Sequence, residues 1–142
     1  SAALFARQAP HFLTAVYNGQ NIMTERRRAL SVRQPHADAI MRGRKKIEYR
    51  SRPTNVRGVI YIYASKTRRT GDEEWMEKYR MQRLDIDELP RGVIVGTVEL
   101  YDCQESDKYN DEFHWLLRHP QPAKRKRKPT NRPQPVWFYP FG

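Results

Sequence analysis

Apolar and polar residues alternate along four stretches of the chain, at residues 30–33, 47–50, 56–64 and 93–103. A period of two residues places successive side chains on opposite faces of a strand, so each stretch predicts a β-strand. In residues 56–64 both faces are apolar or aromatic, which predicts a central strand of a barrel. Gly96 indicates a bulge or a close approach of two backbones within the fourth strand. Residues 136–139 predict a last strand near the end of the chain.

Three other segments, near residues 35–42, 71–82 and 107–118, have the pattern of helices. The first has proline in its first turn and places Ala37, Ile40 and Met41 on one apolar face, so we expect His36 to face solvent. The second begins with acidic residues and ends with basic ones, as the helix dipole favours. Together these elements predict an α+β fold, a mostly antiparallel β-barrel of five or six strands with flanking helices.

The chain has 142 residues, of which 38% are hydrophobic, and this is enough for one core. We therefore expect a single domain over residues 23–142. Residues 1–22 contain no acid and precede Met23; we interpret them as an extension without function, with an acid-poor targeting peptide as the alternative. Residues 119–135 hold five of the ten prolines and a run of five cations, 124–128, and predict an extended basic excursion. An arm that contacts phosphates and a merely solvated loop both remain open.

The net charge of the chain indicates which class of partner it binds. Lys and Arg number 27 against 16 Asp and Glu, for a net charge of +11, which favours an anionic partner and nucleic acid first. A basic, solvated surface is the alternative. No apolar run reaches the length of a membrane span, so we expect no membrane partner.

Cysteine and histidine usage excludes several classes of chemistry. Cys103 is the single cysteine, so no internal disulfide forms, which suits a cytoplasmic protein. The four histidines have no zinc-ligand spacing, and no nucleophile-elbow sequence is present. We expect neither a metal nor another cofactor.

The densest cluster of charge lies at residues 43–50, where four cations and one carboxylate occur in eight residues. Gly43 predicts the end of the first helix, so Lys45 lies at a helix-to-strand corner. Regular alternation would put Lys45 and Glu48 on opposite faces, and they can meet only if Lys45 precedes the strand or the strand is bulged. A lysine that is buried or crowded by cations has a lowered pKa and can act as a base or nucleophile. A structural network of ion pairs is the alternative.

The order Gly43, Lys45, Glu48, Arg50 resembles the signature Gly-x-Lys-x-x-Glu-x-Arg of the ASCH family, small β-barrels of the PUA-like superfamily. The resemblance extends from residue 29 to about residue 118 and more loosely to 135–137, through segments 30–35, 57–65, 89–100 and 113–115. It implies RNA-related roles. It also implies, for one bacterial branch, hydrolysis of N4-acetylcytidine to cytidine and acetate.

In that branch the residue that matches Lys45 is catalytic and acts with a threonine three residues later and a more distant glutamate. This chain has Glu48 at the threonine position, and Glu112, ahead of Glu99, matches the distant glutamate by order. Ser65 is an alternative nucleophile with Lys45 as its base. The expected catalytic residues are thus Lys45, Glu48, Ser65 and Glu112. The expected substrate-binding residues, which offer hydrogen bonds or stacking to cytosine, are Arg33, Gln34, Arg50, Tyr63, His114 and Trp115.

Two function classes follow. The first is an amidohydrolase that acts on N4-acylated cytosine nucleosides. The second is an RNA-binding module, or a ribonuclease, that uses the same basic cleft.

Overall fold

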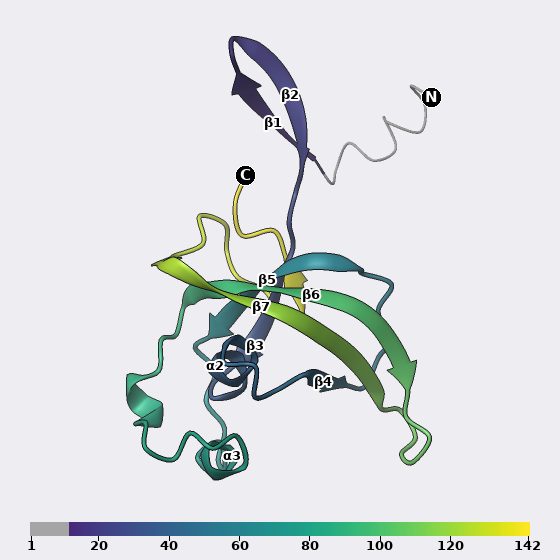
Figure 1. Cartoon of the computed structure of the whole chain (residues 1–142), viewed down its shortest axis with the longest axis vertical. Coiled ribbons are helices and arrows are strands. Elements are labelled where there is room, and N and C mark those ends of the chain that lie inside the picture. Colours follow the sequence, from purple (N-terminus) through teal and green to yellow (C-terminus); the bar gives the residue numbers. More distant parts are fainter. Residues whose placement is uncertain (1–11) are drawn as a thin grey trace.

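The computed structural model of the protein describes residues 12–142. A sheet of six strands, in the order β4-β7-β6-β5-β3-β8, makes up most of the molecule. Every neighbouring pair is antiparallel except β3 and β5, which are parallel. The sheet curls into a half-barrel (Figure 1), which confirms the expected α+β fold of six mostly antiparallel strands with flanking helices. The strands are β3 (Ala29–Arg33), β4 (Ile47–Arg50), β5 (Gly58–Ser65), β6 (Val93–Glu105), β7 (Phe113–Arg127) and β8 (Trp137–Phe138).

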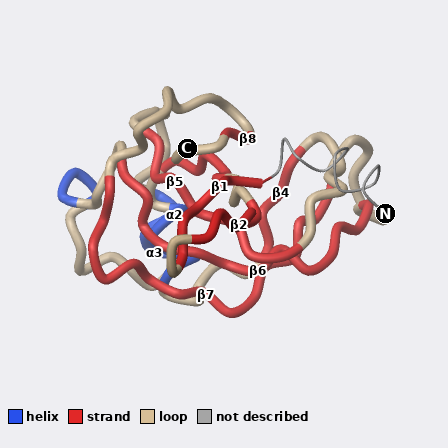
Figure 2. The backbone as a smooth tube through the Cα atoms, turned by 90° about the horizontal axis from the view of Figure 1, so that it is seen from above, coloured by secondary structure: helices blue, strands red, loops and turns tan. Residues whose placement is uncertain are grey.

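Within residues 12–142, three short helices connect the strands. They are α2 (His36–Met41), α3 (Glu74–Lys78) and the 3-10 helix η2 (Ile86–Glu88). Seen from above, the strands curve around α2, which contacts β3, β5, β6 and β7 (Figure 2). The apolar face predicted for this helix, Ala37, Ile40 and Met41, is buried in the main core. The helix expected over 71–82 is shorter than predicted, since turns flank α3 on both sides.

β5 is an interior strand, as its two apolar faces predicted. Ile60, Ile62 and Ala64 point into the main core, where they meet residues from α2, β3, β6 and β7. Gly96 of β6 confirms the predicted close approach, because a side chain there would collide with the backbone of Gln121 and Pro122 and with Met41 Sδ. The pairing of β6 with β7 shifts register beside this glycine.

The helix expected at 107–118 is wrong. Residues 106–112 form a tight turn, closed by a hydrogen bond from Ser106 N to Glu112 O, and β7 begins at Phe113. Phe113, Trp115 and Leu117 are two residues apart and all contact the core, which is a strand period rather than a helical one. The adjacent apolar residue Leu116 concealed this period in the sequence.

The basic excursion expected at 119–135 is also corrected in its first half, since residues 119–127 continue β7 and pair with β6. β4 covers only Phe113 to Leu116 of β7, so Pro120 and Pro122 lie where β7 has no neighbour on its second side. Proline, which has no N–H to donate, is accepted at such an edge. Residues 128–136 have no regular secondary structure.

Ahead of the sheet, β1 (Phe12–Tyr17) and β2 (Gln20–Glu25) pair as an antiparallel hairpin that projects from the half-barrel (Figure 1). Asn18 and Gly19 form its turn with φ of 49° and 75°, the conformation that an Asn-Gly pair favours. The expected extension at 1–22 therefore includes part of this hairpin, and residues 1–11 lie outside the described chain.

Candidate functional site

A cavity of about 860 Å³ opens where the C-terminal end of β3, the corner before β4, the end of β5 and the segment 132–135 meet. We call it the corner cavity. Six of the predicted site residues line it: Arg33, Lys45, Glu48, Arg50, Tyr63 and Ser65.

Lys45 reaches the cavity because α2 ends abruptly. Gly43 takes a φ of 71°, and the N–H groups of Arg44 and Lys45 both donate to Ala39 O, at 2.8 and 3.1 Å. Lys45 therefore precedes β4, which begins at Ile47, and is free of the alternation of the strand. Its side chain turns to the same side as that of Glu48, which confirms the one arrangement in which the two residues can meet without a bulge.

Glu48 is held between two cations. Lys45 Nζ lies 3.5 Å from Glu48 Oε1, and Arg50 Nη2 lies 3.1 Å from Oε2. Arg50 also donates to Ser31 O at 3.0 Å, which fixes its guanidinium on the cavity wall. Burial lowers the pKa of Lys45 below its ordinary value, although the charge of Glu48 and its hydrogen bond oppose this shift. The three side chains form a fixed, net cationic unit.

A second polar pair lies behind this unit. His36 Nδ1 is 2.8 Å from Tyr79 Oη, and the ring of Trp75 packs edge-on against His36 at 5.0 Å. Burial lowers the pKa of His36 to about 4, with further lowering by Lys45 and Arg33, so this imidazole is neutral near pH 7. Burial also raises the pKa of Tyr79. The expectation that His36 faces solvent is wrong, because Trp75 and Tyr79 of the α3 region cover it.

Arg33 is oriented by Asp72 across the cavity rim. Arg33 Nε donates to Asp72 Oδ1 at 2.8 Å, and Asp72 Oδ2 accepts from the backbone N–H of Arg69 at 2.8 Å. Burial alone would raise the pKa of Asp72, but the hydrogen bonds from Arg33 and Arg69 outweigh it and leave that pKa below its ordinary value. Asp72 thus ties the loop after β5 to the end of β3.

Four predicted site residues do not line the corner cavity: Gln34, Trp115, His114 and Glu112. Gln34 is fully buried and spans the core, donating from Nε2 to Pro90 O and accepting from Asp38 N. Trp115 is a core residue that donates to Arg52 O and stacks on Trp137. His114 contacts Glu112 Oε2 at 3.3 Å, at the hairpin end of β7.

The alternative match for the distant glutamate, Glu99, forms a surface ion pair with Arg118. Neither Glu112 nor Glu99 lines the cavity. Glu48 is thus the single carboxylate-bearing residue among the described residues that line it.

The sequence did not predict that residues 132–135 form one wall of the cavity. Ser31 connects this segment to β3, since Ser31 Oγ donates to Gln134 O at 2.7 Å and the N–H of Ser31 donates to Val136 O at 3.0 Å. More than a hundred residues separate these partners, and no local pattern signals their contact. The other lining residues that it did not select include His36, Tyr49, Lys66, Arg69, Trp75 and Arg132.

The cavity is strongly cationic. Six basic residues line it against one carboxylate, and Tyr49, half exposed at 51%, and Trp75 add aromatic surface. Such a wall suits an anion that carries a planar ring.

Two negative findings concern the described chain. Within residues 12–142, no helix is long and apolar enough to cross a membrane. No three His, Cys, Asp or Glu side chains of that part gather where they could hold a metal ion.

Comparison with known proteins identifies the family. The chain is 34% identical over 90 residues to activating signal cointegrator 1 of Homo sapiens and, equally, of Mus musculus. These matches cover 59% of this chain but only 16% of each relative. The fold is similar to the crystal structure of ASCH from Zymomonas mobilis, with a TM-score of 0.53 and 17% identity over 80% of this chain and 87% of that one.

A crystal structure of a tyrosine-to-phenylalanine mutant of the same Zymomonas mobilis protein gives a TM-score of 0.54 at 16% identity, over 81% of this chain and 90% of that one. The ASCH domain profile itself matches residues 30–129, which contain the corner cavity's Lys45, Glu48 and Arg50. This chain therefore belongs to the ASCH domain family.

Proposed function

We propose that this protein binds single-stranded RNA and that one nucleotide enters the corner cavity. The observation that carries this proposal is the composition of the cavity, six cations against one carboxylate with aromatic faces beside them. Phosphate neutralisation supplies most of the affinity in such sites, and stacking of bases on aromatic rings adds to it.

The cavity places its cations at two depths. Lys45 and Arg50 are anchored on the floor by Glu48, whereas Lys66, Arg69 and Arg132 are exposed at the rim. Anchored cations lose little side-chain freedom when an anion arrives, and the planar donors of a guanidinium match phosphate oxygens. The rim cations are suited to the phosphates that flank a bound nucleotide.

The test is titration of a fluorescein-labelled, single-stranded RNA followed by anisotropy at several salt concentrations. On a single strand, a slope of about −2 for log Kobs against log salt corresponds to about three neutralised phosphates. The double variant Arg69→Gln/Arg132→Gln should weaken binding and reduce that slope by about 1.4.

The matched control is Arg83→Gln/Lys108→Gln, which removes the same charge at two exposed cations that do not line the cavity. It should leave the slope nearly unchanged. Equal losses in both double variants, or no binding of the wild type at low salt, would overturn the proposal.

A second candidate function is hydrolysis of N4-acylated cytosine nucleosides, which the lowered pKa of buried Lys45 favours. Glu48 would take a proton from the attacking water, Lys45 would pass a proton to the departing cytosine amine, and Arg50 would position Glu48. Ser65 lines the same cavity and is an alternative nucleophile with Lys45 as its base.

This second function ranks below RNA binding for two reasons. The position of the family's threonine is occupied by Glu48, so its hydroxyl is missing, and both Glu48 oxygens already contact cations. Incubation with N4-acetylcytidine, with released cytidine measured by chromatography, tests it. Absence of cytidine after prolonged incubation would exclude it.

A further inference from the structure

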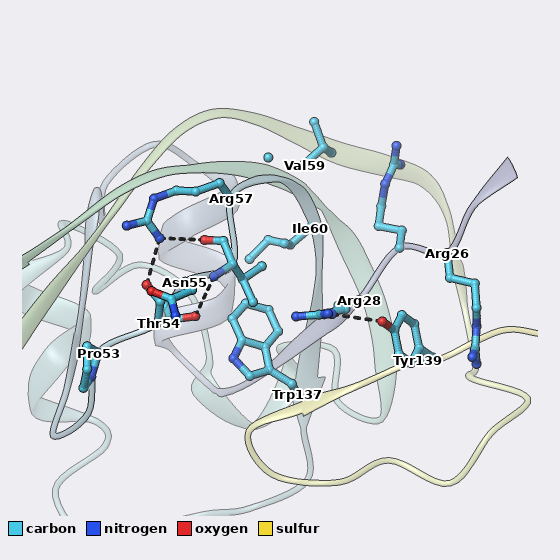
Figure 3. A pocket seen from close by; sticks show the side chains of 13 residues that line it. Arg26, Arg28, Pro53, Thr54, Asn55, Arg57, Val59, Ile60, Trp137 and Tyr139 are labelled. Atoms are coloured by element: carbon cyan, nitrogen blue, oxygen red, sulfur yellow. Dashed lines mark hydrogen bonds between the residues drawn. The ribbon is translucent and has the colours of Figure 1, made fainter. Parts of the chain in front are cut away.

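A second cavity, of about 1040 Å³, lies between the segment that leads into β3, the loop before β5 and the end of the chain after β8 (Figure 3). We call it the arginine cavity. Its wall includes Arg26, Arg27, Arg28 and Arg57, and no Asp or Glu is among the described residues that line it. None of the residues expected to form the functional site belongs to it.

The protein holds two of these arginines in fixed positions. Arg57 Nη1 donates to Thr54 O at 2.9 Å and to Val56 O at 2.8 Å, so its own loop fixes the guanidinium. Across the cavity, Arg28 Nε donates to Tyr139 Oη at 3.0 Å. Arg57 keeps further N–H donors, because a guanidinium has five. A fixed, planar donor group in the wall of a cavity suits an anion with several oxygens.

An aromatic surface lies between the two walls. Figure 3 shows the indole of Trp137 between the Thr54 and Arg57 side and the Arg28 and Tyr139 side. One face of this indole stacks on Trp115, at 5.7 Å between centroids and 7° between planes, and Trp115 is a buried core residue. Trp137 is therefore rigid, half-buried, and next to the arginines, which is the arrangement that stacks a base beside a bound phosphate.

The arginine cavity adjoins the corner cavity through two shared segments. In the first segment, Ser51 lines the corner cavity and Pro53 lines the arginine cavity. In the second segment, Pro135 lines the corner cavity and Trp137 lines the arginine cavity. The members of each pair are two positions apart, which is about 7 Å of extended chain. The two cavities are therefore neighbours along both segments.

We propose that the arginine cavity is a second site for the same nucleic-acid strand, where Arg27 and Arg57 bind phosphodiester groups and Trp137 stacks on a base. This inference rests on the proposed RNA binding in the corner cavity and extends it from one nucleotide to a strand that crosses the Ser51 to Pro53 lip. The specific ligand group, the phosphodiester, is common to RNA and DNA, and the arms of the experiment separate the two.

The experiment titrates the full chain with labelled single-stranded RNA of about three and about twelve nucleotides, lengths below and within the range of common single-strand sites. The wild type should bind the longer RNA at least about tenfold more tightly and with a salt slope steeper by about 1.4. The variant Arg27→Gln/Arg57→Gln, at two exposed residues, should lose this gain and keep the affinity for the short RNA. Arg83→Gln/Lys108→Gln is the charge-matched control and should retain both affinities.

Two further arms test the role of the arginines. Arg27→Lys/Arg57→Lys keeps the charge, so it should preserve the salt slope; if it lost that slope as fully as the Gln variant, the phosphate assignment would be overturned. Single-stranded DNA of the longer length should lose affinity in the Gln variant by the same factor as RNA. A loss confined to RNA would overturn the assignment to phosphodiester groups. Melting temperatures establish that each variant is folded.

The outcomes separate this inference from the proposed function. If neither RNA binds the wild type, the proposed function fails together with the second site. If the short RNA binds but the longer one gains nothing, or if the Gln variant keeps the full gain, the arginine cavity is overturned and the corner cavity stands.

Discussion

Lys45 Nζ and Glu48 Oε1 lie 3.5 Å apart on side chains that are only 7% and 9% exposed, although strand alternation over these positions would separate them. The helix end at Gly43 makes this contact possible. The pair therefore links the turn after α2 to β4. It also fixes one positive and one negative charge in the wall of a basic cavity. Burial of the ammonium group is what lowers the pKa of Lys45.

The buried imidazole of His36 should make stability depend on pH. Its pKa is about 4 in the folded state against 6.5 as the ordinary value, so between these values the unfolded chain binds more protons. Stability from this group is therefore fully present above about pH 6.5 and is lost as the pH falls towards about 4. Four charged side chains face the same ring. Lys45 and Arg33 lower the pKa of His36 further, whereas Glu48 and Asp72 raise it.

The measurement is the free energy of unfolding by urea at steps from pH 7 to pH 4, for the wild type and for His36→Gln. The difference between the two proteins should shrink as the pH falls, because only the wild type loses stability by protonating this ring. A constant difference across that range would contradict the prediction. His119→Gln, at an exposed histidine, is the control and should follow the wild type.

A substitution of Asp72 tests whether RNA binding depends more on the orientation of Arg33 or on the net charge of the cavity rim. Asp72→Asn adds one unit of positive charge, which by long-range attraction alone should tighten RNA binding. It also replaces one of the two acceptor oxygens by an NH2 group, so Arg33 and the backbone N–H of Arg69, each held at 2.8 Å, can no longer both donate to residue 72. We expect the lost orientation of the Arg33 guanidinium to outweigh the added charge, since bidentate guanidinium contacts depend on geometry. The affinity for single-stranded RNA should therefore fall by about threefold to tenfold.

Anisotropy titration measures this change, with Glu88→Gln as the control for the added charge at an exposed acid. If Asp72→Asn bound RNA more tightly than the wild type, net charge rather than the position of Arg33 would govern the rim.

The sequence predicted those parts of the fold whose pattern is local. β5 and β6 were found because apolar side chains recur every second residue, and α2 because Ala37, Ile40 and Met41 share one face. β7 was missed at its start because Trp115, Leu116 and Leu117 form an unbroken apolar run that suits a strand or a helix equally. The second half of β7 was missed because its prolines and cations indicate irregular structure, and only the partner strand decides otherwise.

The candidate site divides in the same way. Lys45, Glu48 and Arg50 could be selected because their charges are too dense for a core segment and their spacing resembles a family signature. His36, Trp75 and Arg132 could not, because they reach the cavity through contacts with elements distant in the sequence. Trp115 was selected for stacking on a ligand, yet its size and apolar neighbours place it in the core.

The basic end of β7 offers a further prediction. Residues 124–126 are exposed, and Arg127 pairs with Ile94 of β6, so deletion of 124–128 would shorten a paired strand. Replacement of Lys124, Arg125 and Lys126 by Gln avoids this problem. We expect the melting temperature to stay within about 2 °C of the wild type, as for other exposed substitutions, and the salt slope of RNA binding to fall.

Thermal unfolding and salt-dependent titration measure the two parts of this prediction. The charge-matched control replaces three exposed cations elsewhere, Arg42, Arg83 and Lys108, by Gln. An unchanged salt slope in the β7 variant would show that this end of the strand is only a solvated surface.

Lys45 separates the two proposed uses of the corner cavity. Lys45→Arg keeps a cation beside Glu48 but cannot release a proton near neutral pH, because arginine remains protonated. RNA affinity should therefore stay within about threefold of the wild type in Lys45→Arg and fall in Lys45→Met. If the cavity hydrolyses N4-acetylcytidine, Lys45→Met and Glu48→Gln should each reduce turnover by about a hundredfold or more. Lys45→Arg should be equally inactive, since in that reaction Lys45 must give and take a proton.

Both assays share one control, Lys46→Met, at the exposed neighbour that does not line the cavity. It should leave turnover unchanged and reduce RNA affinity less than Lys45→Met does. Near-normal hydrolysis by Lys45→Met would exclude a catalytic role for this lysine. Unchanged RNA affinity in the same variant would remove Lys45 from the binding site, and its ion pair with Glu48 would then be a structural link between the end of α2 and β4.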